Sequence, residues 1–193
     1  MSFLVCRAAD TASLAAGLHF GKLKNVATLV GFGEKRCRKN LPLYALLMSS
    51  DIDLKQLEDV LEGLNYTVFF HVYESSLGSD SDTVEIISSC LPDATVGNVV
   101  LSDPDTVLRE FERDVQYRGD TSHGPEPGTI DSPKFRSIFS AVRSRFHDSC
   151  TSADTVHAFW LREGHPAYPV FWDFAYLLRF GDRSEIWIGS SSD

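Results

Sequence analysis

The sequence lacks the features that mark secreted, metal-stabilised or membrane-spanning proteins. It has four cysteines, Cys6, Cys37, Cys90 and Cys150, and no two of them form a CxxC pair. No apolar run approaches the ~20 residues that a membrane-spanning helix needs, and no basic segment leads into an apolar signal core. We therefore expect reduced thiols, a cytoplasmic location and no membrane association.

Motifs for catalysis and ligand binding are also missing. The six histidines show no HxH or HExxH spacing, so we expect no metal site. There is no GxSxG nucleophile elbow, and the glycines of GFGEKRCRKN match neither the P-loop nor the dinucleotide fingerprint. The aromatic residues lack the basic surroundings that stacking on single-stranded nucleic acid requires. From these absences we expect that the protein has no cofactor and no nucleic-acid partner.

What the sequence does contain is a very uneven distribution of charge within a net charge of -9. Residues 1–50 carry seven basic and two acidic side chains, residues 51–131 carry four and eighteen, and residues 132–193 carry seven of each. An acidic block of this kind favours docking onto a basic surface. The carboxylates expected to form the partner surface are Asp80, Asp82, Asp103, Asp105, Glu110 and Glu112.

Hydrophobic periodicity predicts an α+β fold. Helices are predicted at 12–20, 51–64, 81–91, 103–117 and 132–148, and strands at 25–33, 41–50, 66–75, 95–101, 155–163, 170–178 and 185–191. Asp103 before Pro104, and Ser132 before Pro133, are typical helix starts. Helices and strands alternate without a regular βαβ rhythm, so we expect a mostly antiparallel sheet with a C-terminal three-stranded meander packed by helices.

Two helical faces follow from the same spacing. The buried face of the 51–64 helix is expected to hold Leu54, Leu57, Leu61 and Leu64, and that of the 81–91 helix Val84, Ile87, Cys90 and Leu91.

The domain prediction is a single domain over residues 1–193, with a possible subdivision into 1–117 and 132–193. Between them, residues 118–131 contain three glycines and two prolines and show no apolar periodicity. We expect this loop to be mobile, because it offers nothing to bury against the entropy of ordering it.

The last two strands allow a prediction of register. A tight turn at Gly181 and Asp182 places Phe180 opposite Arg183. Pairing outward then places the following residues opposite one another: Leu177 and Ile186, Tyr176 and Trp187, Ala175 and Ile188, Asp173 and Ser190. One face is expected to carry Trp172, Phe174, Tyr176, Leu178 and Trp187, and the other Phe171, Asp173, Ala175, Leu177, Ile186 and Ile188. The strand should therefore be central, with the helix from residue 133 packed on one face.

Asp173 is out of place on such an apolar face, where an unpaired carboxylate is costly. We expect it to be a buried acceptor for Ser190, for backbone donors of the loop GHPAYP, or for Arg179. In the alternative interpretation it is a catalytic or orienting acid, with His165 and His157 as proton carriers. That interpretation predicts a small hydrolase or transferase.

The function favoured by the charge and by the missing motifs is a binding protein that blocks a basic partner. Its size, acidity and expected compartment resemble those of the immunity proteins that bacteria keep against toxins, although no motif carries the resemblance. That resemblance implies a toxin enzyme as the partner. A weaker alternative is a regulatory domain whose basic residues 1–50 touch phosphate or RNA.

Overall fold

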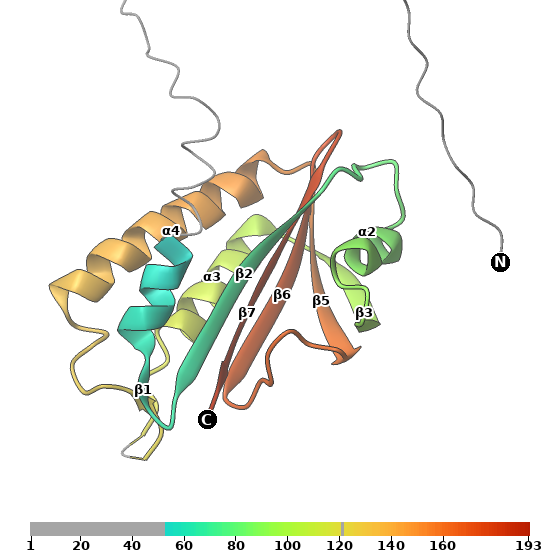
Figure 1. The fold of residues 1–193 in the computed structure, drawn as a ribbon. Coiled ribbons are helices and arrows are strands. Elements are labelled where there is room, and N and C mark those ends of the chain that lie inside the picture. Colours follow the sequence, from blue (N-terminus) through green and yellow to red (C-terminus); the bar gives the residue numbers. More distant parts are fainter. Residues whose placement is uncertain (1–52, 121) are drawn as a thin grey trace, which may run out of the picture. The chain divides into compact units, whose positions relative to one another are not determined.

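The computed structural model describes residues 53–120 and 122–193 (Figure 1). All of them fall within one of the two units into which the chain divides, Asn40–Asp193. The helix predicted at 12–20, the strands predicted at 25–33 and 41–50, and the basic turn between those strands lie outside the described residues.

The described residues form an α+β fold around a five-stranded antiparallel sheet, as the sequence predicts. The strands lie in the order β2 (Thr67–Ser75), β7 (Ser184–Ser192), β6 (Trp172–Arg179), β5 (Thr155–Glu163) and β3 (Thr95–Ser102). The helices are residues 53–61, α2 (Thr83–Cys90), α3 (Pro104–Val115) and α4 (Pro133–Ser152). A separate two-stranded pair joins β1 (Gly63–Leu64) and β4 (Gly124–Pro125).

The predicted C-terminal meander is confirmed, because β5, β6 and β7 are consecutive in the chain and adjacent in the sheet. Its register is also confirmed. Tyr176 lies opposite Trp187 and Asp173 opposite Ser190, and the N–H of Phe180 donates to the carbonyl of Arg183 at 2.8 Å. The turn at residues 181 and 182 fixes this pairing, because the side chains of a strand alternate between its faces.

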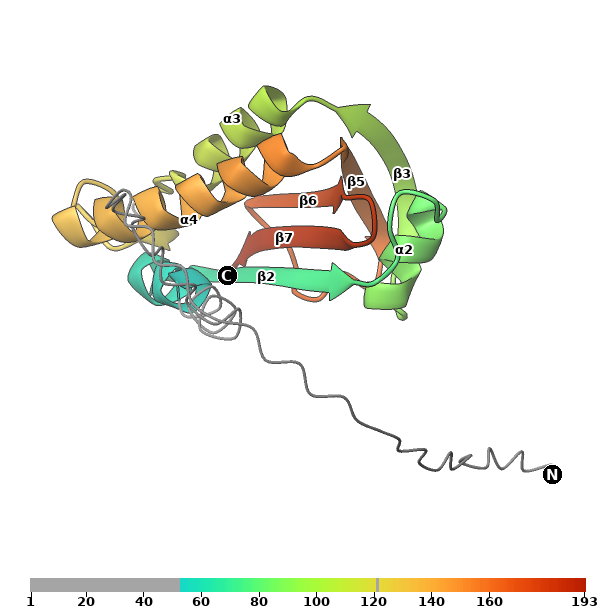
Figure 2. The same ribbon diagram turned by 90° about the horizontal axis from the view of Figure 1, so that it is seen from above.

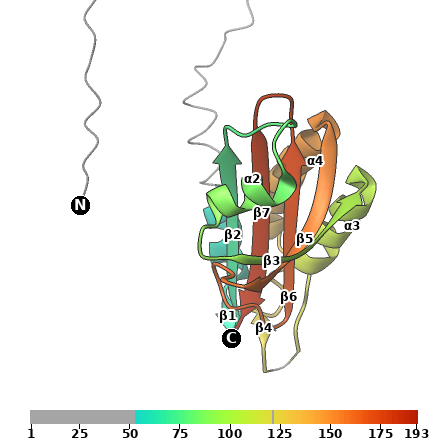
Figure 3. The ribbon, with the colours of Figure 1, turned by 90° about the vertical axis from the view of Figure 1, so that its right-hand side faces the viewer.

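The sheet is covered by helices on both faces. One hydrophobic cluster joins the sheet to the helix at 53–61 and to α3 and α4, and a second joins its opposite face to α2. Figure 2 shows α3 and α4 side by side, and Figure 3 shows α2 on the other side of β6 and β7. Segments on both sides of residues 118–131 contribute to the first cluster, for example Phe111 and Phe146, whose ring centroids lie 4.8 Å apart.

The two predicted helical faces are buried at Leu54, Leu57, Leu61, Ile87 and Leu91, but each prediction includes one residue that is exposed. The first helix ends at residue 61, so Leu64 falls in β1 and is 58% exposed. In α2 the buried face is centred on Ile86 and Ile87, while Val84 is 45% exposed. A helix of eight residues contains two overlapping apolar stripes, and spacing alone does not select between them.

The expectation that the loop 118–131 buries nothing is also wrong. Ile130 belongs to the first hydrophobic cluster, and Gly124 and Pro125 are buried in β4. Arg118 binds both carboxylate oxygens of Asp131, at 2.8 and 3.0 Å. The mobility of the loop stays a prediction, but burial and this ion pair both work against it.

Candidate functional site

One end of the sheet is defined by a continuous row of paired residues. Glu74 pairs with Glu185, Glu185 with Leu178, Leu178 with Val156, and Val156 with Ser102. The loops that follow or precede this row therefore emerge at the same end of the sheet.

Exposed carboxylates from separate segments gather at this end. Ser79 donates its backbone N–H to the carbonyl of Phe180 at 3.1 Å, and Asp154 donates its own to the carbonyl of Arg179 at 2.8 Å. These bonds hold the segments before α2 and before β5 against the β6–β7 turn. We name the group the acidic end; its members, all exposed, are Asp80, Asp82, Asp103, Asp105, Asp154 and Asp182.

Two of these carboxylates also cap helices. Asp82 accepts the N–H groups of Val84 and Glu85, and Asp103 accepts the N–H of Thr106 at 2.9 Å. Hydrogen bonding from Thr106 lowers the pKa of Asp103. A carboxylate at a helix N-terminus is stabilised by the unpaired N–H groups and by the helix dipole, so these two residues have a structural role of their own.

The two glutamates predicted for the same surface lie farther along α3 and are engaged within the molecule. Glu112 forms an ion pair with Arg143 of α4 at 2.5 Å, and Glu110 accepts the hydroxyl of Tyr176 at 3.2 Å. Burial, with Glu110 adding to it, raises the pKa of Tyr176 and keeps it a donor. The structure thus brings together four of the six predicted carboxylates, with Asp154 and Asp182 as unpredicted neighbours.

Two cations near the acidic end are committed to other partners. Arg179 donates through Nη2 to the carbonyls of Ser79 and Ser81, and Arg183 forms an ion pair with Glu185. These arginines brace the turn instead of pairing with the exposed carboxylates. The acidic end therefore keeps a local excess of negative charge.

The predicted burial of Asp173 is wrong, although its register is right. Its side chain is exposed and makes no hydrogen bond or ion pair with any described residue, and the buried hydroxyl of Ser190 has no partner among them either. The reason is that β5 pairs with β6 only as far as Ala158 and Tyr176. The first half of β6 is therefore an open edge.

At this open edge lies a hollow of about 420 Å³. We call it the α3–β6 hollow; it is lined by Arg113, Asp114, Tyr117, Phe171, Trp172 and Asp173. Phe171 precedes β6 and stacks on Tyr117, with ring centroids 5.9 Å apart, so it does not share a strand face with Asp173 as predicted. The hollow is at the opposite end of β6 from the acidic end.

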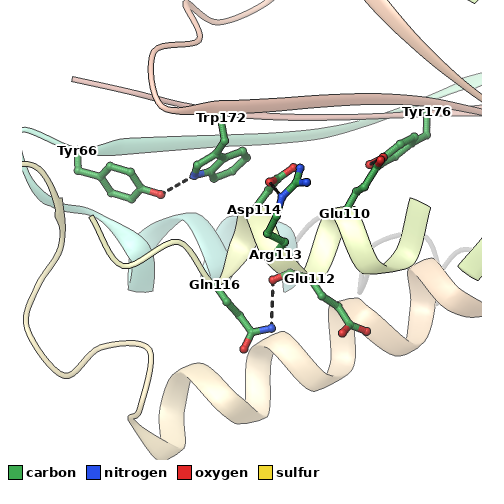
Figure 4. Close-up of polar contacts among 8 residues, drawn as sticks. All are labelled: Tyr66, Glu110, Glu112, Arg113, Asp114, Gln116, Trp172 and Tyr176. Atoms are coloured by element: carbon green, nitrogen blue, oxygen red, sulfur yellow. Dashed lines mark hydrogen bonds and ion pairs between the residues drawn. The ribbon is translucent and has the colours of Figure 1, made fainter. Parts of the chain in front are cut away.

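Asp114 is the one residue of the hollow whose placement is chemically unusual. Its side chain is 7% exposed, and Oδ1 accepts the Nε–H of Arg113 at 2.8 Å (Figure 4). Burial raises its pKa, against the effect of Arg113, and the charges of Glu110 and Asp173 act in the same direction as burial. The sequence signal was its position, three residues after the buried Phe111 and on the same helical face.

The two histidines proposed as proton carriers do not line the α3–β6 hollow. The Nδ1 of His165 is engaged by the backbone of Ala167, two residues along the same loop. His157 lies on β5 opposite Leu177, and burial, followed by the charge of Arg179, lowers its pKa. Asp173 is four residues before Leu177, about 13 Å along an extended strand. The structure thus separates His157 from Asp173.

Residues 53–120 and 122–193 contain no group of three or more His, Cys, Asp or Glu side chains placed to hold a metal ion. In the same part of the chain, no helix combines the length and apolarity that crossing a membrane requires. Comparison of the sequence and fold with family models, curated proteins and solved structures found no match.

Proposed function

We propose that this protein is a cytoplasmic binding protein of the immunity type, whose acidic end docks onto a basic partner, such as a toxin enzyme, and blocks it. The observation that carries the proposal is the acidic end itself. Six exposed carboxylates from separate segments converge at one end of the sheet, and Arg179 and Arg183 nearby are engaged elsewhere. Concentrated charge of one sign accelerates encounter with an oppositely charged cleft.

The fold supports this proposal by holding the acidic end rigidly. The segment before α2 is hydrogen-bonded to the β6–β7 turn, and Asp103 and Asp82 are fixed as helix caps. A preorganised surface loses less entropy on binding than a loose one. We place this function ahead of a hydrolase or transferase because neither His165 nor His157 lines the hollow that contains Asp173.

The experiment compares two variants with the same change in charge. Asp80→Lys with Asp105→Lys alters the acidic end and leaves both helix caps in place. Asp93→Lys with Glu126→Lys alters exposed residues at the other end of the sheet. The parent protein and each variant are used to capture partners from an extract of the source, and the captured proteins are identified. The enzymatic activity of each captured protein is then measured with and without the purified parent or variant.

We expect the parent and the Asp93/Glu126 variant to retain one basic enzyme and to inhibit it at equal stoichiometry. The Asp80/Asp105 variant should bind at least about tenfold more weakly at low salt, which corresponds to ~1.4 kcal/mol. Equal binding by both variants, or capture without inhibition, would refute the proposal.

A further inference from the structure

We propose that the α3–β6 hollow binds a protonated alkyl amine, presented as a lysine side chain of a protein or as a free polyamine. The hollow lies at the opposite end of β6 from the acidic end, so this is a second site that does not depend on the proposed function.

The first argument is a carboxylate whose side chain is largely buried and which lines the hollow. Asp114 lines the hollow with a side chain that is more than nine-tenths buried, and only its Oδ1 receives a hydrogen bond from a described residue. The other carboxylate oxygen can still accept hydrogen bonds, and an ammonium group has three N–H donors to offer. Asp173 stands at the mouth of the same hollow, exposed and without a partner among the described residues.

The second argument is the balance of charge. Asp114 and Asp173 line the hollow, the charge of Glu110 outside the lining also acts on Asp114, and Arg113 is the cation that pairs with Asp114. The guanidinium of Arg113 lies at the rim, with a side chain that is 71% exposed. Two carboxylates against one guanidinium leave the lining of the hollow short of positive charge, and this favours a cationic ligand over an anionic one.

The third argument is the aromatic wall. The rings of Tyr117 and Phe171 line the hollow and stack with their centroids 5.9 Å apart. The buried Tyr66, outside the lining, packs on both rings, and Trp172 donates its Nε1–H to the hydroxyl of Tyr66 at 2.8 Å (Figure 4). These contacts hold the rings in place before any ligand arrives. Aromatic faces attract cations and also cover an alkyl chain, so a wall of rings beside two carboxylates suits an alkylammonium ion.

The experiment uses the full chain and follows the Nε1–H resonance of Trp172 during titration. The probes are Nα-acetyl-lysine N-methylamide, its neutral Nε-acetylated counterpart, and 1,4-diaminobutane. The variants are Asp173→Asn, Tyr117→Leu and, as a matched control, Asp93→Asn, which removes an exposed carboxylate at residue 93, outside the hollow.

We expect saturable shifts with the two cationic probes and none with the neutral one. Asp173→Asn should weaken binding about tenfold, the loss typical of one charged hydrogen bond, while Asp93→Asn should bind like the parent. Tighter binding of the lysine derivative identifies a protein side chain as the ligand, and tighter binding of 1,4-diaminobutane a free polyamine. Equal shifts with the neutral probe, or unchanged affinity in Asp173→Asn, would overturn the proposal.

Discussion

At the scale of single residues, the burial of two aspartates is the reverse of what their sequence positions suggest. Asp173, surrounded in sequence by aromatic and aliphatic side chains, is exposed, whereas Asp114, on an amphipathic helix, is buried. The reason is the same for both. Strand β5 leaves the first half of β6 uncovered, and α3 packs beside that edge and encloses its own carboxylate.

Replacing Asp173 by alanine should change the free energy of unfolding by less than about 0.5 kcal/mol, because exposed side chains without partners contribute little to stability. Urea denaturation of the parent and the variant measures this. A loss of 1 to 3 kcal/mol, as expected for stranded buried donors, would mean that Asp173 has hidden partners after all.

Asp114 should make stability fall with rising pH. Burial raises its pKa in the folded protein, so the folded state holds the proton more tightly than the unfolded chain does. The resulting stability is complete below the unfolded pKa of about 3.9 and is lost as pH rises through the higher folded pKa. Unfolding free energies measured across this range should fall less steeply in Asp114→Asn. Parallel curves would contradict the assignment.

At the scale of secondary-structure elements, the β6–β7 hairpin is set by its turn and by the alternation of its side chains. Gly189 on β7 has a role that its sequence context did not reveal. A side chain there would overlap the rings of Phe174 and Phe70, which pack over it from the neighbouring strands. Strands β2 and β6 can therefore place these rings over β7 only with glycine at this position.

Gly189→Ala should therefore lower the free energy of unfolding by about 1 to 3 kcal/mol, the usual cost of overpacking a well-filled core. Gly181→Ala, in the turn of the same hairpin, is the matched control, because a Cβ at that position meets nothing within 4 Å. Thermal unfolding midpoints of both variants test the comparison. Equal midpoints for the two would show that the rings move aside without cost.

At the scale of the whole molecule, the antiparallel topology converts a charge pattern along the sequence into a charged surface. Asp80, Asp103 and Asp154 are far apart in the chain and lie at the same end of the sheet because β2, β3 and β5 start or finish there. The sequence did not predict Asp154 or Asp182 as members of this surface, because they belong to the neutral last third of the sequence.

The acidic end should make association with a basic partner depend on ionic strength. With the enzyme identified by capture, we expect the association rate constant of the parent to fall as salt rises from low to physiological concentration, where the Debye length is about 8 Å. The Asp80→Lys and Asp105→Lys variant should show a smaller change, with the dissociation rate less affected. Stopped-flow measurements at several salt concentrations decide this, and identical salt slopes would exclude steering by the acidic end.

The sequence by itself determined the local features: the helix caps at Asp103 and Ser132, the five strands of the sheet among the described residues, and the register from Phe180 to Asp173. These depend on backbone hydrogen bonds and on periodicity within a few residues, which the sequence contains directly. Only the tertiary structure decided that Asp173 is exposed, that Asp114 is buried and that the acidic end forms. Each of these depends on which segment lies next to another, and that is set by the packing of the whole sheet and its helices.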